Sequence, residues 1–165
     1  MNRSTTNNVS LFKQTLSALL IIAMMALLSA CASAPPEPEK LDMQISAAED
    51  VNPDMQGRPS PVIVHIMELS STEQFSTLDY MSLTSSSGTA LGTTLLSKNQ
   101  MVLQPGENKQ IPMELDPLTT ALGVVAGYRD IDNATWRTSI AITQGSTKGI
   151  TITLGQQQIV TAVSN

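Results

Sequence analysis

The sequence predicts a mainly β protein, a sandwich of about eight short strands with one small helical insert. Apolar and polar residues alternate over short segments from Lys40 onward, which is the pattern of half-buried strands. Glycine and proline separate these segments at short intervals, as they do between the strands of a sandwich or barrel. The alternation fails over Thr72–Leu83, where a short helix capped by Ser71 or Thr72 is expected.

The first segment, residues 1–30, is typical of a bacterial lipoprotein signal peptide. Two basic residues and no acidic ones precede a nearly uniform apolar run, Leu16–Leu28. The run is shorter than the roughly 20 residues of a membrane-spanning helix and fits the core of a signal peptide. Leu28-Ser29-Ala30-Cys31 resembles a lipobox, so we expect cleavage before Cys31 and a covalent lipid on its thiol. This is the only cysteine, so a disulfide within the chain is impossible.

Residues 31–39 are predicted to tether the folded part to the membrane. The prolines of this segment favour extended polyproline geometry. Ala32 follows the lipidated cysteine, where an aspartate would retain the protein in the inner membrane under enterobacterial sorting. Ala32 therefore predicts the outer membrane, on its periplasmic face.

Charge excludes other kinds of attachment. Nine basic residues less the two in the signal leave 7, against 14 acidic residues, so the mature chain carries −7 with histidine neutral. An acidic chain of this kind is a poor partner for nucleic acid or anionic headgroups. Acyl chains must then provide the membrane attachment.

Residues 40–165 form the predicted sandwich domain. The first strand alternates over Leu41–Ala47, and the second, Pro61–Leu69, is more apolar and is expected to be central. Leu91–Ser97 is interpreted as a further helical turn or irregular chain. Pro112 marks its strand as an edge strand or a bulge. The remaining predicted strands are 100–104, 109–115, 121–128, 137–143, 149–154 and 158–163.

The residue types favour no catalytic or metal site. His65 is the only histidine; the alternation assigns Val62, Val64 and Ile66 to the core, so His65 is expected on the other face, solvated or partly packed. A zinc site needs several converging ligands. Asp130–Asn133 resembles the start of a calcium loop but lacks its glycine and distal glutamate, so a polar turn is the better interpretation. We expect no enzyme activity, no small-molecule substrate and no cofactor beyond the covalent lipid on the cysteine.

Several stretches together resemble one family. The two most specific are Gly57-Arg58-Pro59-Ser60-Pro61 and the run Leu122–Asp130, LGVVAGYRD; Leu91-Gly92, Pro105-Gly106-Glu107 and Trp136-Arg137 support them. The chain resembles TssJ, the outer-membrane lipoprotein of the bacterial type VI secretion system. The resemblance implies a transthyretin-like β-sandwich without enzyme activity. It also implies that the protein anchors the trans-envelope complex by binding the periplasmic C-terminal region of the inner-membrane protein TssM.

In this family the loop between the first two strands carries the contact with TssM, and here it corresponds to Glu49–Ser60. The loop exceeds the 2–5 residues of an ordinary hairpin connection, its prolines stiffen it, and Met55 is a plausible adaptable anchor. Its acidic residues Glu49, Asp50 and Asp54 are expected to meet a basic patch on the partner. The predicted contact residues are Asn52, Pro53, Asp54, Met55, Gln56, Gly57 and Arg58.

Three alternatives stay open at this point. The contact could lie on the insert, Thr72–Ser97. The protein could be a pilotin-like or chaperone lipoprotein that escorts another outer-membrane component. A periplasmic hydrolase or ligand carrier would need a concave pocket with convergent polar groups.

Trp136 is expected to be largely buried.

Overall fold

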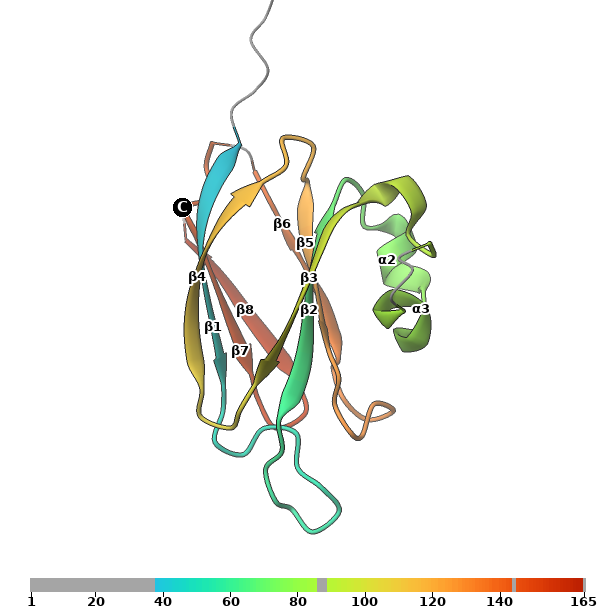
Figure 1. The fold of residues 1–165 in the computed structure, drawn as a ribbon, viewed down its shortest axis with the longest axis vertical. Coiled ribbons are helices and arrows are strands. Elements are labelled where there is room, and N and C mark those ends of the chain that lie inside the picture. Colours follow the sequence, from blue (N-terminus) through green and yellow to red (C-terminus); the bar gives the residue numbers. More distant parts are fainter. Residues whose placement is uncertain (1–37, 86–88, 144, 165) are drawn as a thin grey trace, which may run out of the picture. The chain divides into compact units, whose positions relative to one another are not determined.

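The computed structural model describes residues 38–85, 89–143 and 145–164. The predictions for the signal peptide, Cys31, Ala32 and most of the tether lie outside these ranges. Within them the chain forms a β-sandwich of two four-stranded sheets with a helical segment between the second and third strands (Figure 1). The predicted fold class, strand number and position of the insert are confirmed. None of the helices in the described ranges is long and apolar enough to cross a membrane.

The two sheets take their strands from different parts of the chain. One has the order β4-β1-β7-β8, and the other β3-β2-β5-β6. Within the sheets β1 and β7 are parallel, and every other neighbouring pair is antiparallel. The strands are β1 Glu39–Ala47, β2 Val62–Leu69, β3 Leu95–Leu103, β4 Asn108–Leu115, β5 Ala121–Ala126, β6 Arg137–Ala141, β7 Gly149–Leu154 and β8 Ile159–Ser164.

Local patterns located most strands within a few residues. β2 is central, and β4, which contains Pro112, lies at the edge of its sheet, as predicted. β3 begins earlier than expected, since only Gly92–Thr94 of the irregular segment forms a 3₁₀ turn. Its first residues pair with the end of β2 across a register shift between Glu68 and Leu69. This long-range pairing makes a strand of a segment that has no alternation of its own.

The main core lies between the sheets. Inward side chains of both sheets are almost completely inaccessible, for example Ile45, Val64, Leu122 and Ile152. Burial of such side chains contributes about 1.5–3 kcal/mol each relative to an exposed position. This core fixes which ends of the strands meet and therefore where the connecting loops gather.

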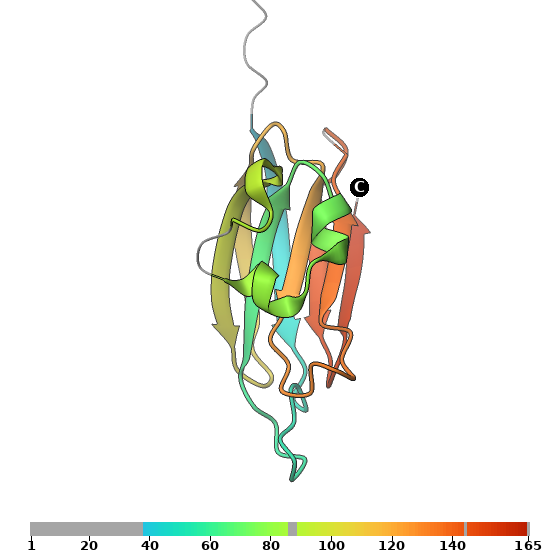
Figure 2. The ribbon, with the colours of Figure 1, turned by 90° about the vertical axis from the view of Figure 1, so that its right-hand side faces the viewer.

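A second, smaller core lies on the outer face of the β3-β2-β5-β6 sheet. The helices α2, Glu73–Thr77, and α3, Tyr80–Thr84, cover this face (Figure 2). The side chains buried here are Met67, Leu69, Phe75, Leu83, Leu91 and Val125. Arg137 Nη1 donates to the carbonyls of Phe75 and Leu78 at 2.9 and 2.7 Å, which ties the insert to β6.

The second core bears on two predictions, of which one is corrected. His65 is only 4% exposed, so the expectation of a solvated or partly packed histidine was wrong: β2 is covered on both faces. Trp136 lies just before β6 and packs as a partly buried side chain against both cores, which agrees with the burial expected for it. Its ring packs edge-on against Tyr80 at 5.6 Å, and the Arg137 guanidinium lies 4.8 Å from its centre.

Candidate partner-binding site

The connection between β1 and β2, residues 48–61, projects from one end of the sandwich (Figure 1). β1 begins at the opposite end of the sandwich. A strand of 9 residues spans roughly 30 Å. The loop and the start of β1 are therefore separated by the length of this strand.

The base of this loop is fixed by Asn52. Its side chain is 3% exposed, and its backbone has the left-handed φ of 50° that asparagine tolerates. Nδ2 donates to the carbonyl of Pro61 at 2.7 Å, and Oδ1 accepts from the backbone N–H of Arg129 at 2.7 Å. Asn52 was predicted as a contact residue, but it is buried within the domain and positions the loop instead.

The tip of the loop is held in a turn by Asp54. Its Oδ1 accepts from the backbone N–H groups of Gln56 and Arg58, both at 2.9 Å, and its Oδ2 accepts from Arg58 Nε at 2.8 Å. These bonds with Arg58 and Gln56 lower the pKa of Asp54 below its ordinary value. Gly57 supplies the φ of 77° that the turn requires. The tip is thus preorganised, which reduces the entropy cost of binding.

Met55 is the most exposed large apolar side chain at this tip. It is 98% exposed, while Asp54 and Arg58 beside it are joined in an ion pair of 2.7 Å. An apolar, flexible side chain held on a rigid turn suits a contact that becomes buried on association. That Met55 anchors the partner remains a prediction, and the exposed position of its side chain on an ordered turn favours it.

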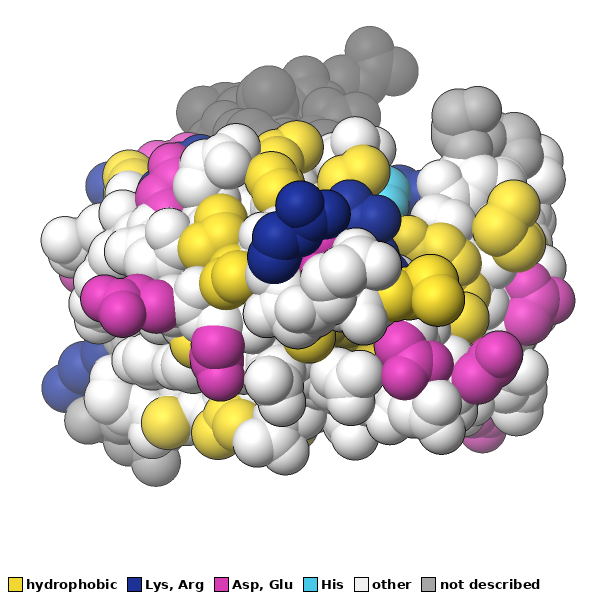
Figure 3. Space-filling view, turned by 90° about the horizontal axis from the view of Figure 1, so that it is seen from below, with side chains coloured by type: hydrophobic (Ala, Val, Ile, Leu, Met, Phe, Trp, Pro, Cys, Tyr) yellow, Lys and Arg dark blue, Asp and Glu magenta, His cyan; other side chains and the backbone are white. Residues whose placement is uncertain are grey.

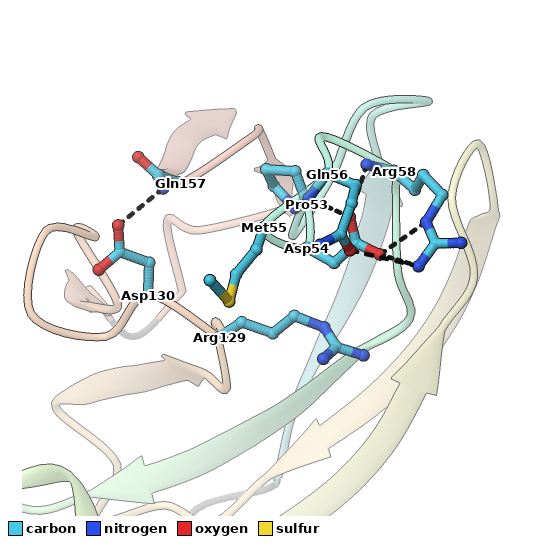
Figure 4. A pocket seen from close by; sticks show the side chains of 8 residues that line it. All are labelled: Pro53, Asp54, Met55, Gln56, Arg58, Arg129, Asp130 and Gln157. Carbon is cyan, nitrogen blue, oxygen red and sulfur yellow. Dashed lines mark hydrogen bonds and ion pairs between the residues drawn. The ribbon is translucent and has the colours of Figure 1, made fainter.

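An open pocket of about 680 Å³ lies beside the loop (Figure 4). Its lining includes the predicted contact residues except Asn52 and Gly57, and adds three that come from the β5–β6 and β7–β8 connections. The lining residues are Pro53, Asp54, Met55, Gln56, Arg58, Arg129, Asp130 and Gln157. None of these last three was predicted to contact a partner, although Arg129 and Asp130 end one of the stretches that carried the family resemblance.

Asp130 belongs to a polar turn, as predicted. Its carboxylate accepts from Asn133 Nδ2 at 2.8 and 3.0 Å and from Gln157 Nε2 at 3.2 Å. The turn closes through the backbone N–H of Ala134, which donates to the Asp130 carbonyl at 3.1 Å. Across the described residues, no group of three or more His, Cys, Asp and Glu is close enough to hold a metal ion.

Viewed from this end, Lys and Arg side chains lie near the middle of the face, with apolar side chains beside them and acidic ones closer to the rim (Figure 3). Both Arg58 and Arg129 are exposed at the pocket. Neighbouring apolar side chains are also accessible, with Ile63 at 41% and Val102 at 44%. The face combines charge with apolar area, as protein–protein contacts do.

The insert offers the other candidate surface. Met81 on α3 is 74% exposed. Lys98 Nζ donates to the carbonyls of Leu83 and Ser85 at 2.8 and 2.9 Å, so this basic side chain holds the end of α3 onto β3. Most apolar side chains of the insert pack in the second core, so few of them remain exposed for a partner.

Solved structures share this fold. The lipoprotein TssJ1 of the type VI secretion system of Pseudomonas aeruginosa is 34% identical, and the match covers 78% of this chain and 98% of that one, with a TM-score of 0.74. Lip of Serratia marcescens, a membrane-bound component of the type VI secretion system, is 23% identical over 78% and 99%, with a TM-score of 0.70. A chain in the structure described as the TssM C-terminal domain from EAEC is 23% identical over 74% and 97%, with a TM-score of 0.61.

Among curated protein sequences, none is significantly similar to this chain. A family model, described as type VI secretion lipoprotein, VasD, EvfM, TssJ, VC_A0113, matches residues 39–157. That range includes all strands but the last and the complete candidate site. The chain belongs to the TssJ family of type VI secretion lipoproteins.

Proposed function

We propose that this protein is a non-catalytic outer-membrane anchor of the type VI secretion membrane complex. Acyl chains on Cys31 hold it in the outer membrane, and Ala32 allows its sorting there. The contact loop, defined as Pro53–Arg58, binds the periplasmic C-terminal region of the inner-membrane protein TssM. Family membership supports this role, and the existence of a chain of this fold in the structure described as the TssM C-terminal domain is consistent with it.

One observation carries the assignment of the contact loop. The loop is rigid, through Asp54 and Arg58, and yet presents Met55 at 98% exposure on the end of the domain opposite the start of β1. A soluble domain gains no stability from an apolar side chain held in water by a network of hydrogen bonds. The same arrangement lowers the cost of burying that side chain against a partner.

The experiment is a matched pair of methionine substitutions. Met55→Gln keeps the Asp54–Arg58 turn, whereas Met81→Gln makes the same change on the insert, where the side chain is 74% exposed. Binding to the purified periplasmic region of TssM from the same organism is measured by calorimetry. We expect Met55→Gln to weaken binding about tenfold, or about 1.4 kcal/mol, and Met81→Gln to bind like the wild type.

The opposite result assigns the contact to the insert. If Met81→Gln loses affinity and Met55→Gln does not, the contact loop is a solvated connection and the insert Thr72–Ser97 is the binding surface. If the wild type itself shows no binding to the TssM region, the proposed function fails.

A further inference from the structure

We infer that Arg129 is a second, cationic part of the partner-binding site, and that it receives a carboxylate carried by the partner next to an apolar side chain. This inference rests on the proposed function and adds the chemistry of the partner surface. It makes the site a composite of the contact loop and the β5–β6 connection, two segments that the fold brings together.

Arg129 is held at the site by its backbone. Its N–H donates to Asn52 Oδ1 at 2.7 Å, which joins the β5–β6 connection to the base of the loop. The preceding residue, Tyr128, is 5% exposed, and its hydroxyl donates to the Gln158 carbonyl at 2.8 Å. The root of Arg129 is therefore fixed relative to the contact loop, while its side chain is exposed at the pocket (Figure 4).

The other charged groups of the pocket are already engaged. Asp54 and Arg58 form an ion pair at 2.7 Å, and amides of Asn133 and Gln157 donate to Asp130. The ion pairs among the described residues are Arg58–Asp54 and Lys109–Glu107, and Arg129 takes part in neither. Its influence on the pocket is a longer-range one that contributes to the lowered pKa of Asp54. Among the four charged side chains that line the pocket, only that of Arg129 has no ion pair or hydrogen bond within the described residues, so its positive charge is the one open to a partner.

This charge reverses the expectation drawn from the sequence. The acidic residues of the loop were expected to meet a basic patch, but the Asp54 carboxylate is saturated by donors within the loop. Glu49 and Asp50 are exposed but do not line the pocket. A guanidinium prefers a carboxylate, which it binds with two parallel hydrogen bonds. Met55 and Pro53 beside it favour an apolar neighbour of that carboxylate.

The test compares charge changes at the two ends of the sandwich. Arg129→Gln removes the charge, Arg129→Glu reverses it and Arg129→Lys keeps it without the guanidinium fork. Lys148→Glu is the control, since Lys148 is exposed and directly precedes Gly149, which pairs with Asp42 near the start of β1. Binding to the periplasmic region of TssM is measured at about 50 mM salt, where charges on the two surfaces interact, and at about 500 mM salt, where this interaction is screened. Melting temperatures check that each variant is folded.

We expect Arg129→Gln to bind about fivefold to tenfold more weakly at low salt, with a smaller salt dependence than the wild type. Arg129→Glu should lose more, Arg129→Lys should lose less than Arg129→Gln, and Lys148→Glu should bind like the wild type. A scan of Asp/Glu→Lys substitutions in the TssM region should then find one that restores binding to Arg129→Glu.

Failure of the inference is distinguishable from failure of the proposed function. If Met55→Gln weakens binding but the Arg129 variants bind like the wild type, the loop is the site and Arg129 is a solvated surface residue. If Arg129→Glu binds more tightly, the partner presents a basic group and the inference is overturned. Absence of wild-type binding refutes the proposed function as a whole.

Discussion

At the scale of single residues, His65 shows how burial on both faces of a strand changes the pKa of a side chain. It lies on the outer face of β2, next in alternation to Met67 of the second core. Within the described residues its Nδ1 has no hydrogen-bond partner. Burial lowers the pKa of His65 below the ordinary 6.5, and the positive charge of Lys98 lowers it further. The imidazole is therefore neutral in the folded protein at pH 7.

This lowered pKa predicts a specific loss of stability in mild acid. Between the ordinary pKa of 6.5 and the lower folded pKa, the unfolded chain binds a proton that the folded domain does not. The free energy of unfolding then falls as the pH falls through this window, by about 1.4 kcal/mol for each unit of pKa shift, and it is fully retained above pH 6.5.

Urea unfolding at pH 7.5, 6.5 and 5.5 measures this loss, with His65→Leu as the comparison. Carboxylates titrate alike in both proteins, so the difference between the two pH profiles isolates His65. We expect the His65→Leu profile to be flatter over this range. Identical slopes would mean that the histidine titrates normally in the fold.

At the scale of elements, the insert docks onto β5 because Gly123 leaves room for it. A Cβ at this position would lie 2.7 Å from Phe75 Cε2 and 3.0 Å from Leu69 Cδ1. Phe75 is the buried residue of α2, so the close approach of helix and strand depends on the missing side chain. Gly127 is a similar case, since its Cβ would lie 2.6 Å from the Tyr80 hydroxyl.

Gly123→Ala should therefore destabilise the domain by about 1–3 kcal/mol through overpacking. The physical cause is tested by a double-mutant cycle with Phe75→Leu, which replaces the opposing ring by a smaller side chain. We expect Phe75→Leu to cost less free energy in the Gly123→Ala background than in the wild type, as measured by urea denaturation. Additive effects of the two substitutions would show that the glycine serves the strand alone and not the docking of the insert.

At the scale of the whole molecule, membrane attachment and folding are expected to be separable. The described sandwich begins at residue 38, beyond the predicted lipidation site at Cys31. Both cores are built from residues 41–159. Stability should then not depend on the lipid, whereas retention at the membrane should depend on it.

Cys31→Ser is predicted to abolish acylation and release a folded protein from the membrane fraction, with a melting temperature within a few degrees of the wild type. Mass spectrometry of the wild-type N-terminus should show a chain beginning at Cys31 with added acyl mass. A mature wild-type chain without acyl mass would contradict the lipoprotein assignment, whatever the variant does.

Local sequence patterns predicted most of the strands and their connections, whereas the start of β3 followed from its pairing with β2. Alternation over Leu41–Ala47 and Gly149–Leu154 identified which residues share a face, and Pro112 identified an edge, because these are local properties of the chain. The family resemblance implied the contact region, and the length and stiffness of the loop before β2 agreed with it.

What covers each face of a sheet, and which loops meet, became known from the assembled fold. β2 is buried along nearly its whole length, and an insert that follows it in the chain folds back over the outer face of its sheet. The place of Arg129 depends on a hydrogen bond to Asn52, 77 positions away. Such contacts leave no local pattern, since the periodicity of a strand fixes the direction of its side chains but not their neighbours. For that reason the contact loop could be predicted from the sequence. The part of Arg129 in the proposed site could be inferred only from the folded structure.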